Sequence, residues 1–183
     1  MDKEWKTVEV LRHSRHDWLN KMQLIKGNID LNRIDHVKAI IEEIIIESQH
    51  ESKLSNLDMP KFVETLLTAN WRSFLFRVEF EVVSLELGCC ELDEFMASWI
   101  ENLFDSLSQT LCNYGENVLF VSIDENKQRN LRLSFELQGT IENERVLFDF
   151  LNQPWKESFC TEVTHFGIDE VHFYMEIPCN KNK

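Results

Sequence analysis

The sequence predicts an α+β protein of two parts: an N-terminal helical hairpin that dimerises into a four-helix bundle, and a C-terminal α/β sandwich. Three observations predict this fold. Apolar residues recur at helical spacing through the first 50 residues, they alternate with polar residues in several later segments, and a polar stretch at residues 50–60 lies between these two patterns. We therefore expect the hairpin at residues 1–55 and the α/β domain at residues 56–183.

The first predicted helix covers residues 5–25. One side of this helix carries an apolar stripe whose only charged member is Arg15, and Gly27 and Asn28 are typical of the helix end that follows. The stripe consists of Val8, Leu11, Arg15, Trp18, Met22 and Ile25.

The second predicted helix begins at Asp35, a residue type that caps helix N-termini. Its apolar arc, from Ile40 to Ile45, is about 140° wide at 100° per residue, which is broader than a two-stranded seam. Two helices cannot bury both stripes, so pairing with a second copy is the favoured arrangement. The alternative is that the hairpin packs onto the rest of its own chain. The second stripe consists of Val37, Ile41, Ile44 and Ser48, flanked by Ile34, Ile40 and Ile45.

Beyond Pro60 the pattern predicts three helices and five strands. The helices are expected at residues 61–74, 92–111 and 142–151. The strands are expected at residues 76–85, 118–123, 131–137, 159–165 and 171–177. The order α, β, α, β, β, α, β, β is typical of a mixed sheet with helices on one face.

The charge of the chain is unevenly distributed. The 183 residues carry 19 basic and 32 acidic side chains, for a formal net charge of −13. Within residues 1–28, however, six basic side chains outnumber four acidic ones. The acidic total argues against nucleic acid or an anionic membrane as a partner, and the locally basic segment favours an acidic protein partner.

Other features of composition exclude further classes of protein. Only five glycines are present, too few for the usual loops that wrap nucleotide phosphates. The five cysteines lack metal-ligand spacing, and the adjacent Cys89 and Cys90 are interpreted as ordinary buried thiols. Because the sequence shows neither a signal segment nor a membrane-spanning stretch, we expect a cytoplasmic protein without a metal site.

The densest cluster of reactive side chains lies in the middle of the first helix, at residues 13–20. On a helical wheel, His16 falls well away from the apolar stripe and faces water. An exposed imidazole on a rigid helix can act as a nucleophile, and Asp17 and Asn20 are close enough to orient it. A solvated histidine without a role remains an alternative from the pattern alone. The other histidines, including His13, are interpreted as structural or solvent-exposed.

The residues around His16 resemble a known family. The segment HSRHDWLNKMQLIKGNIDL, together with HESKLSNL at residues 50–57, closely resembles the sporulation initiation phosphotransferase B family. The core His16-Asp17-Trp18-Leu19-Asn20 also resembles the phosphoacceptor box of sensor histidine kinases. Over residues 60–183 the resemblance is one of layout more than of motif.

This resemblance implies a specific activity. His16 matches the phosphorylated histidine of the family, which relays a phosphoryl group from the aspartate of a single-domain response regulator to the aspartate of the regulator that controls sporulation transcription. It also implies a phosphotransfer hairpin that dimerises and a C-terminal domain like a degenerate kinase ATP-binding domain. On this hypothesis Asp17 and Asn20 assist His16, and Arg12, Leu19 and Gln23 form the docking face around it. Arg15 is assigned either to phosphate contact or to a buried ion pair in the bundle.

No nucleotide or cofactor of its own is expected for such a chain. An aspartyl phosphate is already activated, and the Mg²⁺ that neutralises its charge is expected to come with the partner regulator.

Two alternative functions remain open from the sequence. The segment ENLFDSL at residues 101–107 resembles the N-box of ATP-dependent histidine kinases, but Ser106 stands where that pattern has a metal-chelating Asn, and no glycine-rich phosphate loop follows. An active kinase is therefore disfavoured, and this helix is expected to face the core. The other alternative is a non-catalytic adaptor that binds response regulators.

Overall fold

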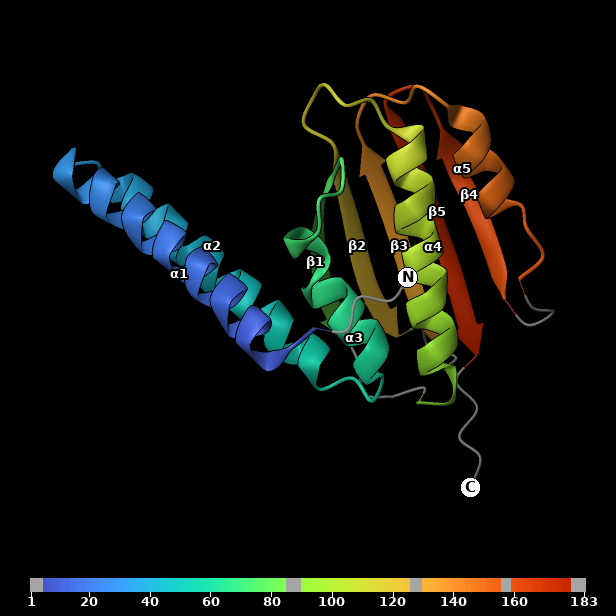
Figure 1. Ribbon diagram of the computed structural model, residues 1–183, viewed down its shortest axis with the longest axis horizontal. Helices are drawn as coiled ribbons and strands as arrows, with labels where there is room; N and C mark the ends of the chain where they lie inside the picture. Colours follow the sequence, from blue (N-terminus) through green and yellow to red (C-terminus); the bar gives the residue numbers. More distant parts are fainter. Residues whose placement is uncertain (1–4, 85–89, 126–129, 156–158, 179–183) are drawn as a thin grey trace. The chain divides into compact units, whose positions relative to one another are not determined.

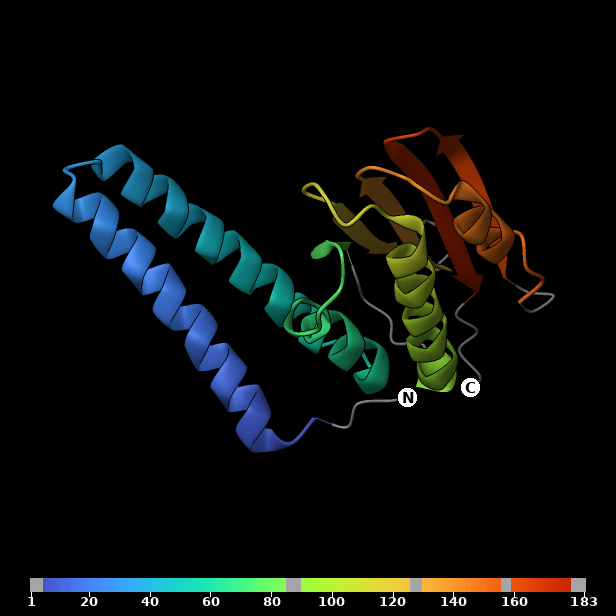
Figure 2. The ribbon, with the colours of Figure 1, turned by 45° about the horizontal axis from the view of Figure 1, so that its top comes forward.

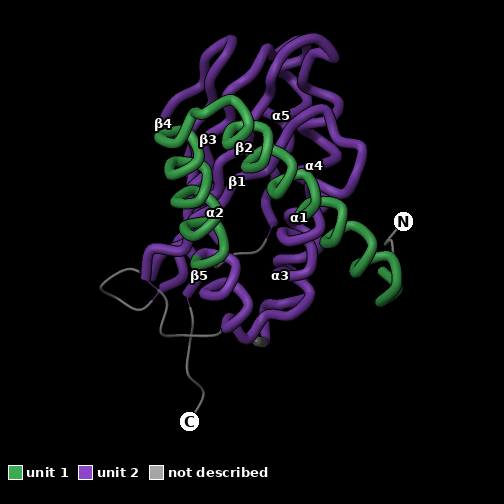
Figure 3. Tube along the Cα trace, turned by 90° about the vertical axis from the view of Figure 1, so that its left-hand side faces the viewer, with its two compact units in different colours: residues 1–49 green, residues 50–183 purple. Residues whose placement is uncertain are grey.

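The computed structural model describes residues 5–84, 90–125, 130–155 and 159–178 (Figure 1). The chain divides between Gln49 and His50 into two compact units, which Figure 3 draws in different colours. The predicted domain boundary at residues 55/56 stays a prediction. Among the described residues, no helix combines the length and the apolar character that a membrane span requires.

The first unit is built on two antiparallel helices, α1 (Thr7–Asp30) and α2 (Ile34–Ser55), which lie side by side (Figure 2). The predicted helix end at Gly27 and Asn28 is wrong, because α1 continues to Asp30. The turn forms later because the Leu31 N–H bonds to the Gly27 carbonyl and Asn32 adopts a left-handed φ of 55°. Asp35 lies inside the first turn of α2 and is not its cap, since the helix already begins at Ile34.

The second unit contains a five-stranded sheet with helices on one face (Figure 1). The strand order is β1-β2-β3-β5-β4, and only the β1–β2 pair is parallel. The strands are β1 (Arg77–Ser84), β2 (Val118–Glu125), β3 (Asn130–Gln138), β4 (Cys160–Phe166) and β5 (Glu170–Pro178). The helices are α3 (Pro60–Leu67), α4 (Asp93–Thr110) and α5 (Glu144–Leu151), with short 3₁₀ turns η1 (Ala69–Trp71) and η2 (Cys90–Leu92). The predicted α+β class and order of elements are confirmed.

Helix α3 is shorter than predicted. A continuous helix was expected over residues 61–74, but α3 ends at Leu67 and η1 follows. The side chain of Asn70 explains the change of direction: its amide donates to the Val78 carbonyl at 2.7 Å and accepts from the Val78 N–H at 2.8 Å. Asn70 therefore acts as a short strand partner for the edge of β1.

The core of the second unit lies between the sheet and its helices. Alternate strand residues are buried, as the period-two pattern predicts, and the faces of α3 and α4 pack against them. Leu103, Phe104 and Leu107 of α4 are fully buried, so the prediction that this helix faces the core is confirmed. The largest fully buried side chains are Trp99, Phe62, Phe104, Phe135 and Phe173. Burying each such side chain contributes about 1.5–3 kcal/mol of hydrophobic stabilisation.

Cysteine placement is described only in part. Cys112 is a free thiol and is buried. Cys89 and the side chain of Cys90 lie outside the described residues, so their interpretation as buried thiols stays a prediction.

The N-terminus of α3 is capped from a distant part of the chain. The N-cap residue Met59 has no side chain that can accept a hydrogen bond from the helix. Instead, the buried carboxylate of Asp93 accepts hydrogen bonds from the N–H groups of Lys61, at 3.1 Å, and Phe62, at 2.9 Å. A carboxylate here also complements the positive end of the helix dipole.

Replacing this carboxylate should destabilise the second unit. We expect Asp93→Ala to lower the free energy of unfolding by about 1–3 kcal/mol, because one buried and one partly buried N–H group lose their acceptor. Urea unfolding of the 183-residue chain, followed by tryptophan fluorescence, measures this change. The matched control is Glu94→Ala, which removes the exposed neighbouring carboxylate. A loss as large in Glu94→Ala as in Asp93→Ala contradicts the capping role.

Candidate functional site

His16 lies in the middle of α1 with its imidazole in solvent. Its side chain is 71% exposed. The Nδ1 atom is 3.2 Å from the Asn20 side-chain nitrogen and 3.5 Å from Asp17 Oδ1. In the described part of the chain, Nε2 has no hydrogen-bond partner. The two neighbours therefore hold one ring nitrogen and leave the other accessible.

Helix geometry explains why these three side chains meet. Asn20 is one turn after His16, so both lie on the same side of α1. Asp17 follows directly in the sequence, and its Oδ1 atom lies 3.5 Å from the Nδ1 atom of the ring. The predicted proximity of Asp17 and Asn20 to His16 is seen in these distances.

The chemistry of the ring depends on which nitrogen carries the proton. When Nδ1 is protonated, its N–H group donates toward Asp17 Oδ1. The Asn20 side-chain amide then turns by 180°, so that its oxygen rather than its nitrogen faces this N–H group. The lone pair of Nε2 then points into solvent. A neutral imidazole in this form is a nucleophile, and the nearby carboxylate stabilises the positive charge that develops on the ring.

The predicted docking residues surround His16 on α1. Arg12 lies one turn before it, Leu19 and Gln23 lie after it, and all three are exposed. Leu19 exposes 54% of its surface. Arg15 is exposed too, and neither Arg12 nor Arg15 has an ion-pair partner among the described residues.

The side of α1 that faces α2 is polar. Lys21 Nζ lies 2.5 Å from Glu47 Oε2 and joins the two helices. The Lys21 ammonium also lies 5.8 Å from the Trp18 ring centroid. His13 is partly buried and makes an edge-to-face contact with Trp5 at 5.4 Å. The two histidines of the cluster therefore have different surroundings, and only His16 stands clear.

The apolar stripe of α1 is left largely uncovered within the first unit. Val8 and Leu11 are 67% and 58% exposed, and Trp18 and Met22 are also exposed. Several isoleucines of α2 share this exposure: Ile34, Ile41, Ile45 and Ile46. An apolar surface of this kind on a helical hairpin marks an interaction face.

The N-box-like segment of α4 uses its polar side chains within the helix. The Asn102 amide donates to the Ser98 carbonyl, and the Ser106 hydroxyl donates to the Asn102 carbonyl, both at 2.8 Å. Glu101 pairs with both terminal nitrogens of Arg72. Glu101 therefore links α4 to the segment after η1, whereas the Asn102 and Ser106 bonds stay within α4.

Two side chains at the end of α2 hydrogen bond to the edge strand β1. The sequence pattern gave neither of them this role. His50 Nδ1 accepts the Val82 N–H at 3.0 Å, and Lys53 Nζ donates to the Val82 carbonyl at 3.0 Å. They lie in the segment at residues 50–57 that carries part of the family resemblance. No local signal in the sequence could have shown this contact, because the strand lies about 30 residues away.

Comparison with known proteins identifies the family. Residues 1–57 match "Sensor_kinase_SpoOB-type, alpha-helical domain", and residues 58–178 match "Sporulation initiation phospho-transferase B, C-terminal". The chain is also 35% identical over 171 residues to sporulation initiation phosphotransferase B of Bacillus subtilis strain 168, covering 93% of this chain and 88% of the relative. The chain belongs to the sporulation initiation phosphotransferase B family. The predicted membership and phosphotransferase activity in a sporulation phosphorelay are thus confirmed, with response regulators as partners.

Solved histidine kinases show more distant similarity. The blue-light activated histidine kinase of Erythrobacter litoralis EL346 is 10% identical, with a TM-score of 0.46 over all of this chain and 63% of that one. The histidine kinase AdeS of Acinetobacter baumannii is 15% identical, with a TM-score of 0.45 over 91% of this chain and 98% of that one.

Proposed function

We propose that His16 is the phosphoryl carrier of this phosphotransferase. It takes the group from the phospho-aspartate of a single-domain response regulator and passes it to the aspartate of the regulator that controls sporulation transcription. The observation that carries the proposal is the exposed imidazole in mid-helix, held at Nδ1 and open at Nε2. The family membership supports it, since the segment around His16 resembles the phosphoacceptor box of that family.

The transfer needs a nucleophile in line with the bond that breaks. The Nε2 lone pair attacks phosphorus, the bond between phosphorus and the aspartyl oxygen breaks, and the regulator's carboxylate leaves with that electron pair. The phosphorylated ring is cationic while Nδ1 keeps its proton. Attack by the second regulator's carboxylate on phosphorus reverses these steps and returns His16 to its neutral form. Because an acyl phosphate is already activated, positioning supplies most of what the reaction requires, without ATP.

Asp17 and Asn20 act on the other side of the ring. The Asp17 carboxylate stabilises the positive charge that the imidazole acquires as Nε2 bonds to phosphorus. Asn20 fixes the rotation of the ring, so that Nε2 faces the incoming regulator. Both roles follow from the distances of 3.5 Å and 3.2 Å to Nδ1.

Arg12, Arg15, Leu19 and Gln23 form the docking surface around His16. Leu19 supplies an apolar contact, Gln23 supplies hydrogen bonds, and Arg12 supplies positive charge toward an anionic receiver site. Arg15 belongs to the α1 stripe, so it serves either phosphate contact at the edge of this surface or an ion pair within the bundle. Mg²⁺ belongs to the receiver domain, where it neutralises charge on the transferring phosphoryl group.

The hairpin functions as a homodimer. Pairing two hairpins into a four-helix bundle covers the exposed stripe of α1 and the exposed isoleucines of α2. His16 lies off this stripe, so bundle formation leaves the imidazole accessible to a receiver domain.

Removing the His16 imidazole should abolish transfer. When the protein is mixed with a phosphorylated receiver domain in the absence of ATP, we expect wild type to acquire acid-labile phosphate and His16→Gln to acquire none. His13→Gln is the matched control and should keep most of the labelling, because His13 packs against Trp5. Labelling of His16→Gln, or loss of labelling only in His13→Gln, contradicts the assignment. Labelling of wild type from ATP alone would instead indicate a kinase.

Removing the contacts of Asp17 or Asn20 with His16 Nδ1 should slow phosphoryl transfer without weakening the binding of the receiver. We expect Asp17→Asn and Asn20→Ala each to lower the single-turnover rate at saturating receiver by about tenfold, which corresponds to about 1.4 kcal/mol of transition-state stabilisation. Gln23→Ala is the contrasting variant, with weaker receiver binding and a nearly unchanged saturated rate. Quenched-flow phosphorylation separates the two effects. If Asp17→Asn and Asn20→Ala change only receiver affinity, the positioning role is wrong.

A charge placed among the exposed isoleucines should weaken the dimer. Ile41→Asp puts a carboxylate without a counter-charge into the apolar seam, and we expect a tenfold or larger increase in the dimer dissociation constant, about 1.4 kcal/mol or more. Sedimentation equilibrium measures this constant. Gln49→Asp adds the same charge at an exposed polar position of α2 and should have a much smaller effect. Equal dimerisation of wild type and Ile41→Asp argues against the bundle.

A further inference from the structure

The sheet of the second unit has one face that its helices do not cover. We call this the open face; it consists of the outward-pointing side chains on the side of the sheet opposite α3, α4 and α5 (Figure 1). Among the described residues it is strongly acidic. Its carboxylates are Glu79, Glu81, Asp124, Glu136, Glu162, Glu170 and Glu176, and its guanidinium groups are Arg77 and Arg132.

One aromatic ring of the open face already binds a cation from its own chain. The Arg132 guanidinium lies 4.0 Å from the Tyr174 ring centroid, with Nη1 3.8 Å from Glu176 Oε1. The Tyr174 hydroxyl donates to Glu162, and this hydrogen bond to a carboxylate raises the pKa of Tyr174. A guanidinium stacked on a ring beside carboxylates is a favourable arrangement.

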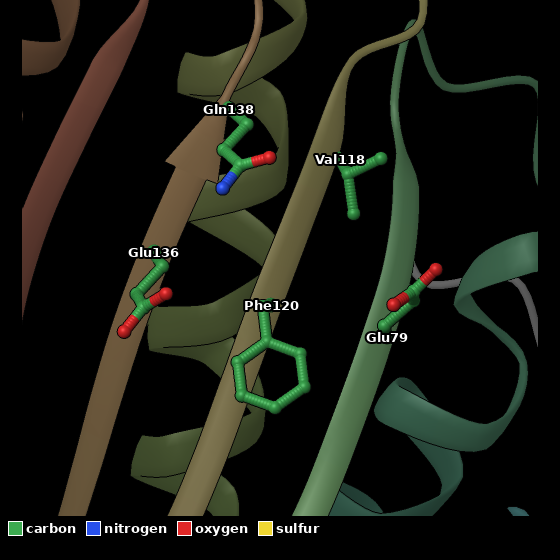
Figure 4. Close-up of a pocket in the computed structure, with 5 residues that line it drawn as sticks. All are labelled: Glu79, Val118, Phe120, Glu136 and Gln138. Carbon is green, nitrogen blue, oxygen red and sulfur yellow. The ribbon is translucent and has the colours of Figure 1, made fainter.

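A second aromatic ring has the same surroundings but no cation. Glu79, Phe120 and Glu136 stand directly opposite one another on β1, β2 and β3. Neighbouring strands are about 4.8 Å apart, so the two glutamates flank the ring with their Cα atoms about 10 Å apart. The three residues line a hollow of about 290 Å³ together with Val118 and Gln138 (Figure 4).

The charges around this hollow are only partly compensated. Arg77 pairs with Glu79. Glu136 has no ion-pair partner in the part of the chain that the structure describes, and no lysine or arginine described there lies over the Phe120 ring. A partly exposed ring and an unpaired carboxylate thus remain available to a positively charged group.

We propose that this hollow receives an arginine side chain from a basic segment of a partner protein. The guanidinium stacks on Phe120 and donates to Glu136 and Glu79, as Arg132 stacks on Tyr174 two strands away. Arginine suits the site better than lysine because its planar group stacks on a ring and donates to two carboxylates at once.

The charge of the whole open face argues for an extended partner segment. Carboxylates continue beyond the hollow on β1, β2, β4 and β5, so a chain with several positive charges is complementary to the face as well as to the hollow. The open face of a second copy is a poorer occupant, because the same excess of carboxylates on both faces makes them repel. A metal ion is also a poorer one, since the described residues contain no group of three side chains arranged to hold it.

A short arginine peptide tests the proposal on the 183-residue protein. The probe is the fluorescein-labelled peptide Gly-Arg-Gly-Arg-Gly-Arg amide, and its control has citrulline in place of each arginine. We expect fluorescence anisotropy to show binding of the arginine peptide only. Glu79→Gln with Glu136→Gln, and separately Phe120→Leu, should each weaken binding about tenfold or more, whereas Phe120→Tyr should retain it because a ring remains.

The matched control removes the same charge elsewhere. Asp105→Asn with Glu144→Gln neutralises two exposed carboxylates on α4 and α5 and should leave peptide binding nearly unchanged. Equal weakening by this pair would show general attraction to an acidic protein and overturn the proposal. Equal binding of the citrulline peptide would overturn it too, as would self-association that depends on Glu79 and Glu136, because the occupant would then be a second copy.

Transfer through His16 separates this proposal from the function proposed above. Labelling from a phosphorylated receiver should be the same in the open-face variants as in wild type. A loss of labelling in His16→Gln with normal peptide binding supports two independent sites. Loss of labelling in the open-face variants would overturn the assignment of the hollow to a partner that takes no part in transfer.

Discussion

The surface of helix α1 has three sides, and each side makes a different kind of contact. The side with Lys21 joins α2 through Glu47, the stripe with Leu11 and Trp18 offers apolar surface, and the side with His16 faces water. Successive residues are separated by 100°, so moving His16 by one position along the sequence would rotate it into one of the other two sides. The accessibility of the imidazole therefore depends on the register between the apolar stripe and the His16 position, and this register is local to one helix.

The second unit has the architecture of a sheet covered by helices, but its polar side chains serve the domain itself. Asn102 and Ser106 hydrogen bond to the backbone of their own helix, and Glu101 holds Arg72. The proposed reaction makes no demand on these residues, because an acyl phosphate arrives already activated.

The parts of the fold that could be predicted from sequence are those set by local periodicity. Strand alternation and helical spacing identified the helices and strands in order, and the helical wheel placed His16 away from the stripe, with Asn20 one turn later. The end of α3 could not be predicted, because Asn70 stops it by bonding to Val78 on a strand. The capping of α3 by Asp93 and the contact of His50 with Val82 likewise join residues about 30 positions apart. The hollow at Phe120 depends on the register of three strands, and a one-residue slip would send its side chains to the other face.

The positive and negative charges of the chain lie on different surfaces of the structure. The positive excess of residues 1–28 lies on the helix that presents His16, and the open face of the sheet is negative. In the proposed transfer, a receiver domain approaches with an anionic phosphorylated carboxylate, which the positive charge of this helix attracts. This attraction favours approach of the receiver to the imidazole. The same negative face attracts basic segments, so one charge distribution can separate two kinds of partner onto two surfaces.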